Sequence, residues 1–102
     1  MADMRVFIGT RDLLFRSKLR AVVVAAGGVV VTDDAACDLA VLEFEAEGVT
    51  ERVRALVGRG VPVLAYGSHV RTGLLRAARE AGATAVPNSQ VEQRLYAFVA
   101  ST

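Results

Sequence analysis

The chain has 102 residues, a length that suits one core, so we expect a single domain over residues 1–102. Hydrophobic residues make up 53% of it and charged residues 23%, which excludes a disordered or collagen-like chain. The formal net charge of +1 gives no global field that would recruit nucleic acid or an anionic membrane, and no apolar run approaches the roughly 20 residues of a membrane span. We therefore expect a cytoplasmic protein with neither a nucleic-acid nor a membrane partner.

Short apolar runs recur along the chain, bounded by residues that favour turns. They predict five strands, in chain order Arg5–Gly9, Val29–Val31, Asp38–Leu42, Val61–Tyr66 and Ala83–Val86. Because these runs are apolar throughout and do not alternate with polar residues, we expect strands that are buried on both faces, as in a parallel sheet.

Amphipathic stretches lie between most of these runs and predict four helices. The residues expected to open them are Thr10–Asp12, Thr50, Ser68 and the capping-box pattern Ser89–Glu92. The apolar stripes expected to face the core include Phe15, Leu19, Val22 and Ala26 in the first helix and Val53, Leu56 and Val57 in the second. Strands and helices in this alternation indicate a small three-layer, doubly wound α/β domain.

One connection breaks the alternation, because only Thr32–Cys37 separates the second strand from the third. A crossover between parallel strands usually takes a dozen or more residues. We therefore predict that the helix between these strands is missing or vestigial and that the sheet face beneath it is partly bare. A bare apolar face favours a partner, so we expect a homodimer or a complex with another protein that buries this face.

Three stretches follow the patterns of one known family: Asp38–Gly48, Pro62–Ser68 and Leu74–Ala83. They resemble the third strand, the fourth strand and the fourth helix of the receiver domain of bacterial response regulators. The resemblance covers nearly the whole chain and implies a flavodoxin-like fold with a five-stranded parallel sheet in the order 2-1-3-4-5.

The resemblance also implies where a receiver's functional residues would fall. The acidic pair that holds Mg²⁺ falls at Thr10 and Arg11, and the phosphoacceptor aspartate falls at Glu43. The switch threonine or serine falls at Gly67, and the switch aromatic falls at Val86. The lysine that contacts the phosphoryl group falls at Ser89, or at Asn88 after a shift of one residue. None of these positions keeps the family's chemistry. Aspartyl phosphorylation needs a divalent cation on hard oxygen ligands, and Arg11 would repel that cation. We therefore predict a degenerate receiver that is not phosphorylated.

Glu43 admits two interpretations. It could mimic a phosphorylated aspartate, although it brings one negative charge where a phosphoryl group brings about −1.5 to −2. Alternatively, its carboxylate is solvated or pairs with Arg11. The second interpretation is favoured because Gly67 and Val86 lack the hydroxyl and the ring that would transmit a signal.

An acidic block occupies the middle of the chain, where seven of the eleven acidic residues lie between Asp33 and Glu51. A divalent-cation site could form from Asp12, Glu43 and either Asp33 or Asp34. Separated surface acids seldom converge on an ion, so a solvated loop edge is the preferred interpretation. Cys37 and His69 are the only residues of their types, which leaves no zinc pattern. We predict no metal and no cofactor.

No catalytic residue is predicted either. Ser68 and His69 are adjacent and have neither a nucleophile elbow nor an orienting acid, so a helix cap and a surface histidine explain them better. Cys37 has no basic neighbour in the sequence to stabilise a thiolate, and we expect a buried or inert thiol.

Eleven of the twelve basic residues are arginine, and those of the last two predicted helices could form a partner surface: Arg71, Arg76, Arg79 and Arg94. Such a surface would meet an acidic partner or the acidic block of a second copy. A solvated face is the equal alternative.

The leading prediction is a non-catalytic, phosphorylation-independent receiver-like domain that acts through protein–protein interaction in signalling or regulation. The alternative is a module that binds a small ligand or an anion at the C-terminal ends of the strands. Its expected contacts are Thr10, Arg11, Asp12, Ser68, His69 and Asn88. No glycine-rich phosphate loop follows the first strand, which argues against a nucleotide site of the usual kind.

Overall fold

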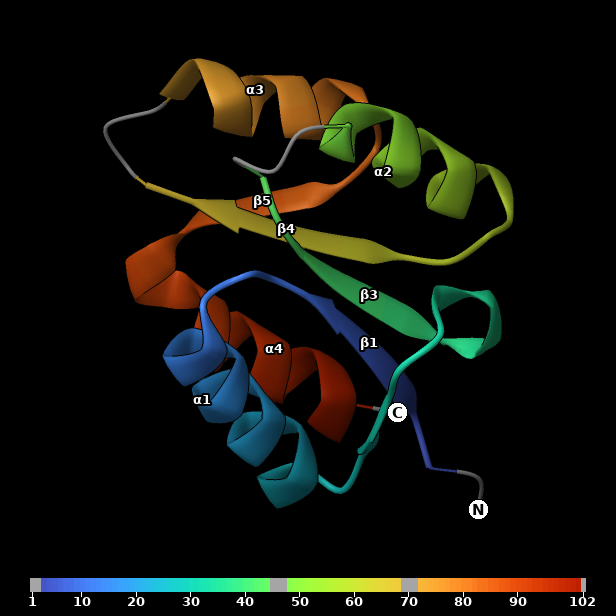
Figure 1. Cartoon of the computed structure of the whole chain (residues 1–102), viewed down its shortest axis with the longest axis vertical. Helices are drawn as coiled ribbons and strands as arrows, with labels where there is room; N and C mark the ends of the chain where they lie inside the picture. The colour runs from blue at the N-terminus through green and yellow to red at the C-terminus, as the bar shows by residue number, and fades with distance from the viewer. Residues whose placement is uncertain (1–2, 45–47, 69–71, 102) are drawn as a thin grey trace.

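The computed structural model describes residues 3–44, 48–68 and 72–101. A parallel five-stranded sheet runs through its middle in the order β2-β1-β3-β4-β5 (Figure 1). The strands are β1 (Arg5–Gly9), β2 (Val29–Val31), β3 (Leu39–Glu43), β4 (Val63–Gly67) and β5 (Thr84–Pro87). The α-helices are α1 (Leu13–Ala25), α2 (Val49–Gly58), α3 (Thr72–Glu80) and α4 (Val91–Ala100). The doubly wound fold and its strand order are confirmed.

Helices cover both faces of the sheet (Figure 1). On one face α1 and α4 pack on alternate strand residues, and Leu19 and Leu95 are fully buried there. On the other face α2 and α3 pack on the intervening strand residues, with Val53 and Ala78 fully buried. The alternation follows from the strand geometry, which sends successive side chains to opposite faces. No helix in the described part is long and apolar enough to cross a membrane.

The close approach of α1 and α4 depends on a glycine. A Cβ added at Gly28 would come within 2.9 Å of Val99 Cγ1, 3.0 Å of Val23 Cγ1 and 3.1 Å of the Met4 carbonyl oxygen. Gly28 therefore lets the chain turn from α1 into β2 between the ends of the two helices. The preceding Gly27 has a φ of 93°, the left-handed conformation that commonly ends a helix.

The capping residues predicted from the sequence agree with the structure at some helix starts and not at others. Asp12 caps α1 as predicted, because its Oδ1 accepts a bond from the Phe15 backbone N–H at 3.0 Å. Gly48, with a φ of 76°, precedes α2, so Thr50 lies inside the helix and does not cap it. Ser68 is the last described residue before α3, which is described from Thr72, and the residues between them lie outside the described part of the chain.

The expected capping box at α4 is also absent. A 3₁₀ turn, η2 (Asn88–Gln90), leads directly into α4, and Gln90 occupies the cap position without a side-chain bond. Ser89 thus lies within the turn and not at the start of the helix.

Two expected core residues are exposed. Val57 of α2 is 36% exposed, so it lies at the margin of the helix's buried face. Val29 is 40% exposed because β2 is a three-residue strand at the edge of the sheet. The second strand is therefore only partly buried, contrary to the prediction from its three valines.

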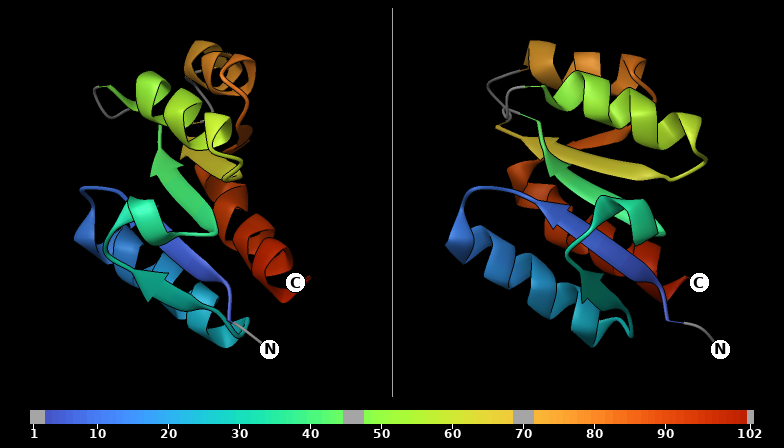
Figure 2. Two further views of the ribbon diagram at one scale, coloured as in Figure 1. Left: turned by 90° about the vertical axis from the view of Figure 1, so that its right-hand side faces the viewer. Right: turned by 45° about the vertical axis from the view of Figure 1, so that its right-hand side comes forward.

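The connection between β2 and β3 holds no α-helix, as predicted. It contains a single 3₁₀ turn, η1 (Asp34–Ala36), which Figure 2 shows on the side of the sheet where α2 lies. The sheet beneath it is less bare than predicted, because Phe7 is only 9% exposed. The guanidinium of Arg52, on α2, lies over the Phe7 ring at 4.7 Å from its centre and covers it.

Candidate functional site

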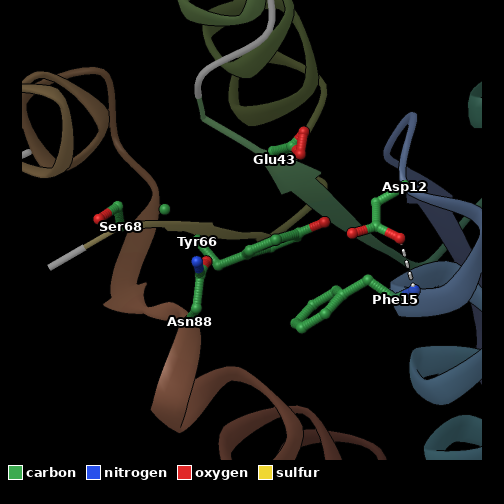
Figure 3. A pocket seen from close by; sticks show the side chains of 7 residues that line it. Asp12, Phe15, Glu43, Tyr66, Ser68 and Asn88 are labelled. Atoms are coloured by element: carbon green, nitrogen blue, oxygen red, sulfur yellow. Dashed lines mark hydrogen bonds between the residues drawn. The ribbon is translucent and has the colours of Figure 1, made fainter.

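Several polar side chains meet at the C-terminal edge of the sheet. Glu43 ends β3 and pairs in register with Tyr66 of β4, while Gly67 pairs with Pro87 at the end of β5. A small pocket of about 70 Å³ opens here (Figure 3). It is lined by Asp12, Phe15, Glu43, Tyr66, Gly67, Ser68 and Asn88. At about 30 Å³ for each water molecule, the pocket has room for an ion or a few waters only.

Within this pocket the Glu43 carboxylate is bonded to the loop after β1. The Thr10 hydroxyl lies 3.3 Å from Glu43 Oε2, in a half-buried position. Thr10 Oγ1 also accepts a bond from the Asp12 backbone N–H at 3.2 Å. The Glu43–Arg11 pair considered from the sequence does not form within the described residues, and Thr10 is the partner of Glu43 instead.

Tyr66 and Phe15 supply the apolar wall of the pocket, and no motif in the sequence marks Tyr66 as a site residue. Its ring stacks on Phe15, with 5.0 Å between the ring centres and 27° between the planes. Its buried hydroxyl has no hydrogen-bond partner within the described residues. Figure 3 shows the hydroxyl pointing toward Asp12.

Burial raises the pKa of the Tyr66 phenol to about 12. The nearby Thr10 hydroxyl acts in the opposite direction, but it does not reach hydrogen-bond geometry with the phenol. The phenol is therefore neutral at physiological pH. Tyr66 is the β4 neighbour of Glu43, so aligning the ends of the two predicted strands would have placed Tyr66 at the site.

The structure separates the other positions implied by the resemblance. Gly67 and Asn88 line the pocket with Glu43. Val86 is 3% exposed and packs in the core beneath α1 and α4. Ser89 is exposed in η2 and does not line the pocket. His69 lies outside the described residues.

The carboxylates considered for a divalent-cation site do not converge. Asp12 caps α1 and Asp33 accepts a bond from the Ala35 backbone N–H at 2.9 Å. Asp34 pairs with Arg52 at 3.0 Å. Across the described ranges, no three acidic, histidine or cysteine side chains gather closely enough to hold an ion.

Cys37 is buried, in agreement with one of its two interpretations. Its Sγ donates to the Asp34 carbonyl oxygen at 3.1 Å. Burial, followed by the charge of Asp34, raises the pKa of the Cys37 thiol. A thiol with a raised pKa is a poor nucleophile, so we assign Cys37 a packing role.

The arginines of the expected partner surface divide between two faces. Arg76 and Arg79 lie on α3, whereas Arg94 lies on α4 across the sheet (Figure 1). Arg79 Nη2 donates to the Ala85 carbonyl oxygen at 3.0 Å and so serves the fold. Arg71 lies outside the described residues. A surface shared by these arginines would have to pass around the β5 edge.

No family model and no curated protein sequence matches the chain. Its fold is that of receiver domains. It superposes with a TM-score of 0.75 and 19% identity on the signal receiver domain of NarL from Mycobacterium tuberculosis, over 99% of this chain and 96% of that one. For HP1043, an orphan response regulator of H. pylori, the values are 0.76 and 14%, over 96% and 94% of the two chains.

A response regulator receiver protein from Pseudoalteromonas atlantica gives a TM-score of 0.75 at 15% identity, over 95% of this chain and 94% of that one. The likeness to receiver domains that the sequence indicated is thus confirmed in the fold.

Proposed function

We propose that this receiver-like domain acts in signalling through contact with other proteins and without phosphorylation or catalysis. The bond between Thr10 and Glu43 is the observation that carries the proposal. This bond joins two positions that the resemblance to receiver domains assigns to the phosphoacceptor and to a magnesium ligand. A cytoplasmic location belongs to the same proposal.

The chemistry of the surrounding side chains supports this. Phosphoryl transfer to a carboxylate needs a cation that neutralises the developing charge, and Mg²⁺ requires hard oxygen ligands. Thr10 offers one neutral hydroxyl, which is already bonded to Glu43, and the neighbouring Arg11 carries a positive charge. Asn88 brings a neutral amide to the pocket in place of an ammonium group.

Exposed apolar side chains on α1 support self-association. Leu13 and Leu14 are 75% and 80% exposed, and Val24, eleven residues after Leu13 on the same side of the helix, is 61% exposed. Exposed large apolar residues on one helix mark a contact surface more strongly than scattered ones. Arg52 already covers the sheet face at Phe7, so we place the contact surface on α1 and not on the sheet. We propose a second copy of the chain as its partner.

Intact-mass measurement after incubation with acetyl phosphate and Mg²⁺ tests the chemical half of the proposal. We expect no phosphoryl adduct on the wild-type chain. A receiver domain with a complete aspartate set, treated in parallel, checks the reagents. An adduct that maps to Glu43 would contradict the proposal.

Sedimentation velocity across micromolar to millimolar protein tests the association half. We expect a dimer that dissociates on dilution, and a shift toward monomer in Leu14→Glu, because a charge replaces an apolar contact. Ala55→Glu introduces the same single charge at an exposed position of α2, on the opposite face of the sheet, and serves as the control. A wild-type monomer at every concentration would rule out self-association.

A further inference from the structure

A hollow of about 430 Å³ opens beside η1, at the C-terminal ends of β1 and β2. It is separate from the small pocket at Glu43, and Thr10 lies between the two hollows. Three arginines reach it from different segments of the chain. The rest of its lining is small, hydroxyl-bearing or apolar, and the full set is Arg11, Arg16, Arg52, Gly9, Thr10, Thr32, Phe7 and Ile8.

Arg52 is held in place at this hollow. Its Nε and Nη2 donate to Asp34 Oδ2 at 3.1 and 3.0 Å, and its guanidinium lies over Phe7. Its Nη1 makes no hydrogen bond within the described residues and lies next to Gly9, where an added Cβ would come within 3.8 Å of it. The side chain is thus ordered by two contacts while one of its nitrogens remains available.

Arg11 and Arg16 add two further positive charges. Neither forms an ion pair within the described ranges. Among the described residues, Asp34 is the only one whose carboxylate bonds a lining arginine, so the three guanidinium groups share one acidic partner there. Asp12 and Glu43 line the neighbouring pocket beyond Thr10, where a backbone N–H and a hydroxyl respectively bind them.

We propose that this arginine-lined hollow binds the phosphate group of a small phosphorylated metabolite. The guanidinium fork matches the oxygens of a phosphate, and the hydroxyl of Thr32 lines the same space. The volume falls within the roughly 300–1,000 Å³ of small-molecule sites, which is more than a free phosphate needs. This inference goes beyond the proposed signalling role and does not depend on it.

Amide NMR titrations with inorganic phosphate and with adenosine 5′-monophosphate, at matched ionic strength, test the proposal. We expect saturable shifts at Gly9, Thr10 and Thr32, with tighter binding of the nucleotide. Arg11→Gln and Arg16→Gln should each weaken binding by about tenfold or more, the loss of one charge-assisted hydrogen bond. Arg20→Gln removes the same charge from an exposed position of α1 outside the hollow and should weaken it by less than about twofold.

The absence of saturable shifts at millimolar nucleotide would overturn the proposal. Equal weakening by Arg20→Gln and Arg11→Gln would overturn it too, because only the overall charge would then matter. Equal affinity for the two probes would show that the site reads the phosphate alone and would overturn the assignment to a metabolite. Sedimentation of the same variants separates this result from the association proposal, since Arg11→Gln leaves Leu13, Leu14 and Val24 intact.

Discussion

The hydroxyl of Thr10 lies 3.3 Å from Oε2 of Glu43, so the loop after β1 is bonded to the last residue of β3. These residues are 33 positions apart in the chain. The bond satisfies a half-buried carboxylate with a neutral donor, at the edge where the C-terminal ends of parallel strands meet. It ties the first loop to the centre of the sheet.

Replacing Thr10 by valine should lower the free energy of unfolding by about 1–3 kcal/mol. The variant loses the bond to Glu43 and the bond from the Asp12 backbone N–H, each worth about 0.5–1.5 kcal/mol. Urea unfolding monitored by circular dichroism gives the value. Thr32→Val is the control, because the side chain of exposed Thr32 makes no hydrogen bond within the described residues, so this variant should change stability by less than about 0.5 kcal/mol. Equal losses in the two variants would show that the Thr10 bonds contribute nothing.

Tyr66→Phe should leave the stability unchanged or raise it slightly. The variant keeps the ring that stacks on Phe15 and removes a buried hydroxyl that has no hydrogen-bond partner within the described residues. Tyr66→Leu, which removes the ring, should lose at least about 1 kcal/mol from the stacking and the packing. Thermal and urea unfolding of both variants test this, and a marked loss in Tyr66→Phe would show that the hydroxyl is bonded.

The same tyrosine should make the stability depend on pH in the alkaline range. An unfolded tyrosine ionises near pH 10, whereas burial raises the pKa of Tyr66 to about 12 in the folded chain. The folded state therefore favours the neutral phenol, and the resulting stability is complete below about pH 10 and is lost as the pH rises toward 12. Unfolding measured at intervals across this range should show a decline that Tyr66→Phe reduces. Parallel declines in the two proteins would contradict the shift.

Gly28→Ala should destabilise the chain by about 1–3 kcal/mol, the usual cost of overpacking. The new methyl group would press on Val99, on Val23 and on the Met4 carbonyl oxygen, and so push α1 and α4 apart. Gly58→Ala is the matched control, because it adds the same methyl group at the end of α2 with no atom within 4 Å. It should be neutral or stabilising by up to about 1 kcal/mol. Comparable midpoints of thermal unfolding would contradict the packing argument.

Asp38 should titrate below its ordinary range. The Arg5 side chain bonds its carboxylate at 3.2 Å, and the Arg5 backbone N–H bonds it at 2.9 Å, and together they lower the pKa of Asp38. The resulting stability is present above the unfolded pKa of about 3.9 and is lost as the pH falls through the folded value. Carboxyl NMR should show the pKa of Asp38 rising toward the ordinary value in Arg5→Gln. Arg54→Gln, at an exposed position on α2, should leave it unchanged, and an unmoved Asp38 in Arg5→Gln would contradict the assignment.

The strands were predictable because their apolar runs require burial on both faces. Three of them extend one residue further than the apolar pattern indicates, to Glu43, Gly67 and Pro87. These residues continue the ladder against their neighbours, as the pairs Glu43–Tyr66 and Gly67–Pro87 show. The apolar pattern stops one residue earlier in each of these strands, whereas the pairing of the backbones continues.

Helix starts were less predictable because several nearby residues compete for the cap. Asp12 was identified correctly, but Gly48 takes the position expected for Thr50, and a 3₁₀ turn replaces the capping box at Ser89. A side-chain cap adds only about 1 kcal/mol, so the path of the preceding loop decides which residue stands first.

The amino-acid sequence by itself determined the class of fold, the order of its elements and the missing crossover helix. Each of these depends on local periodicity or on residue identity. Only the tertiary structure decided which side chains meet: Thr10 with Glu43, Tyr66 with Phe15, and Arg52 with Asp34 and Phe7. Contacts such as that of Asp34 with Arg52, 18 residues apart, depend on strand register and on the direction of each side chain, which no local pattern contains.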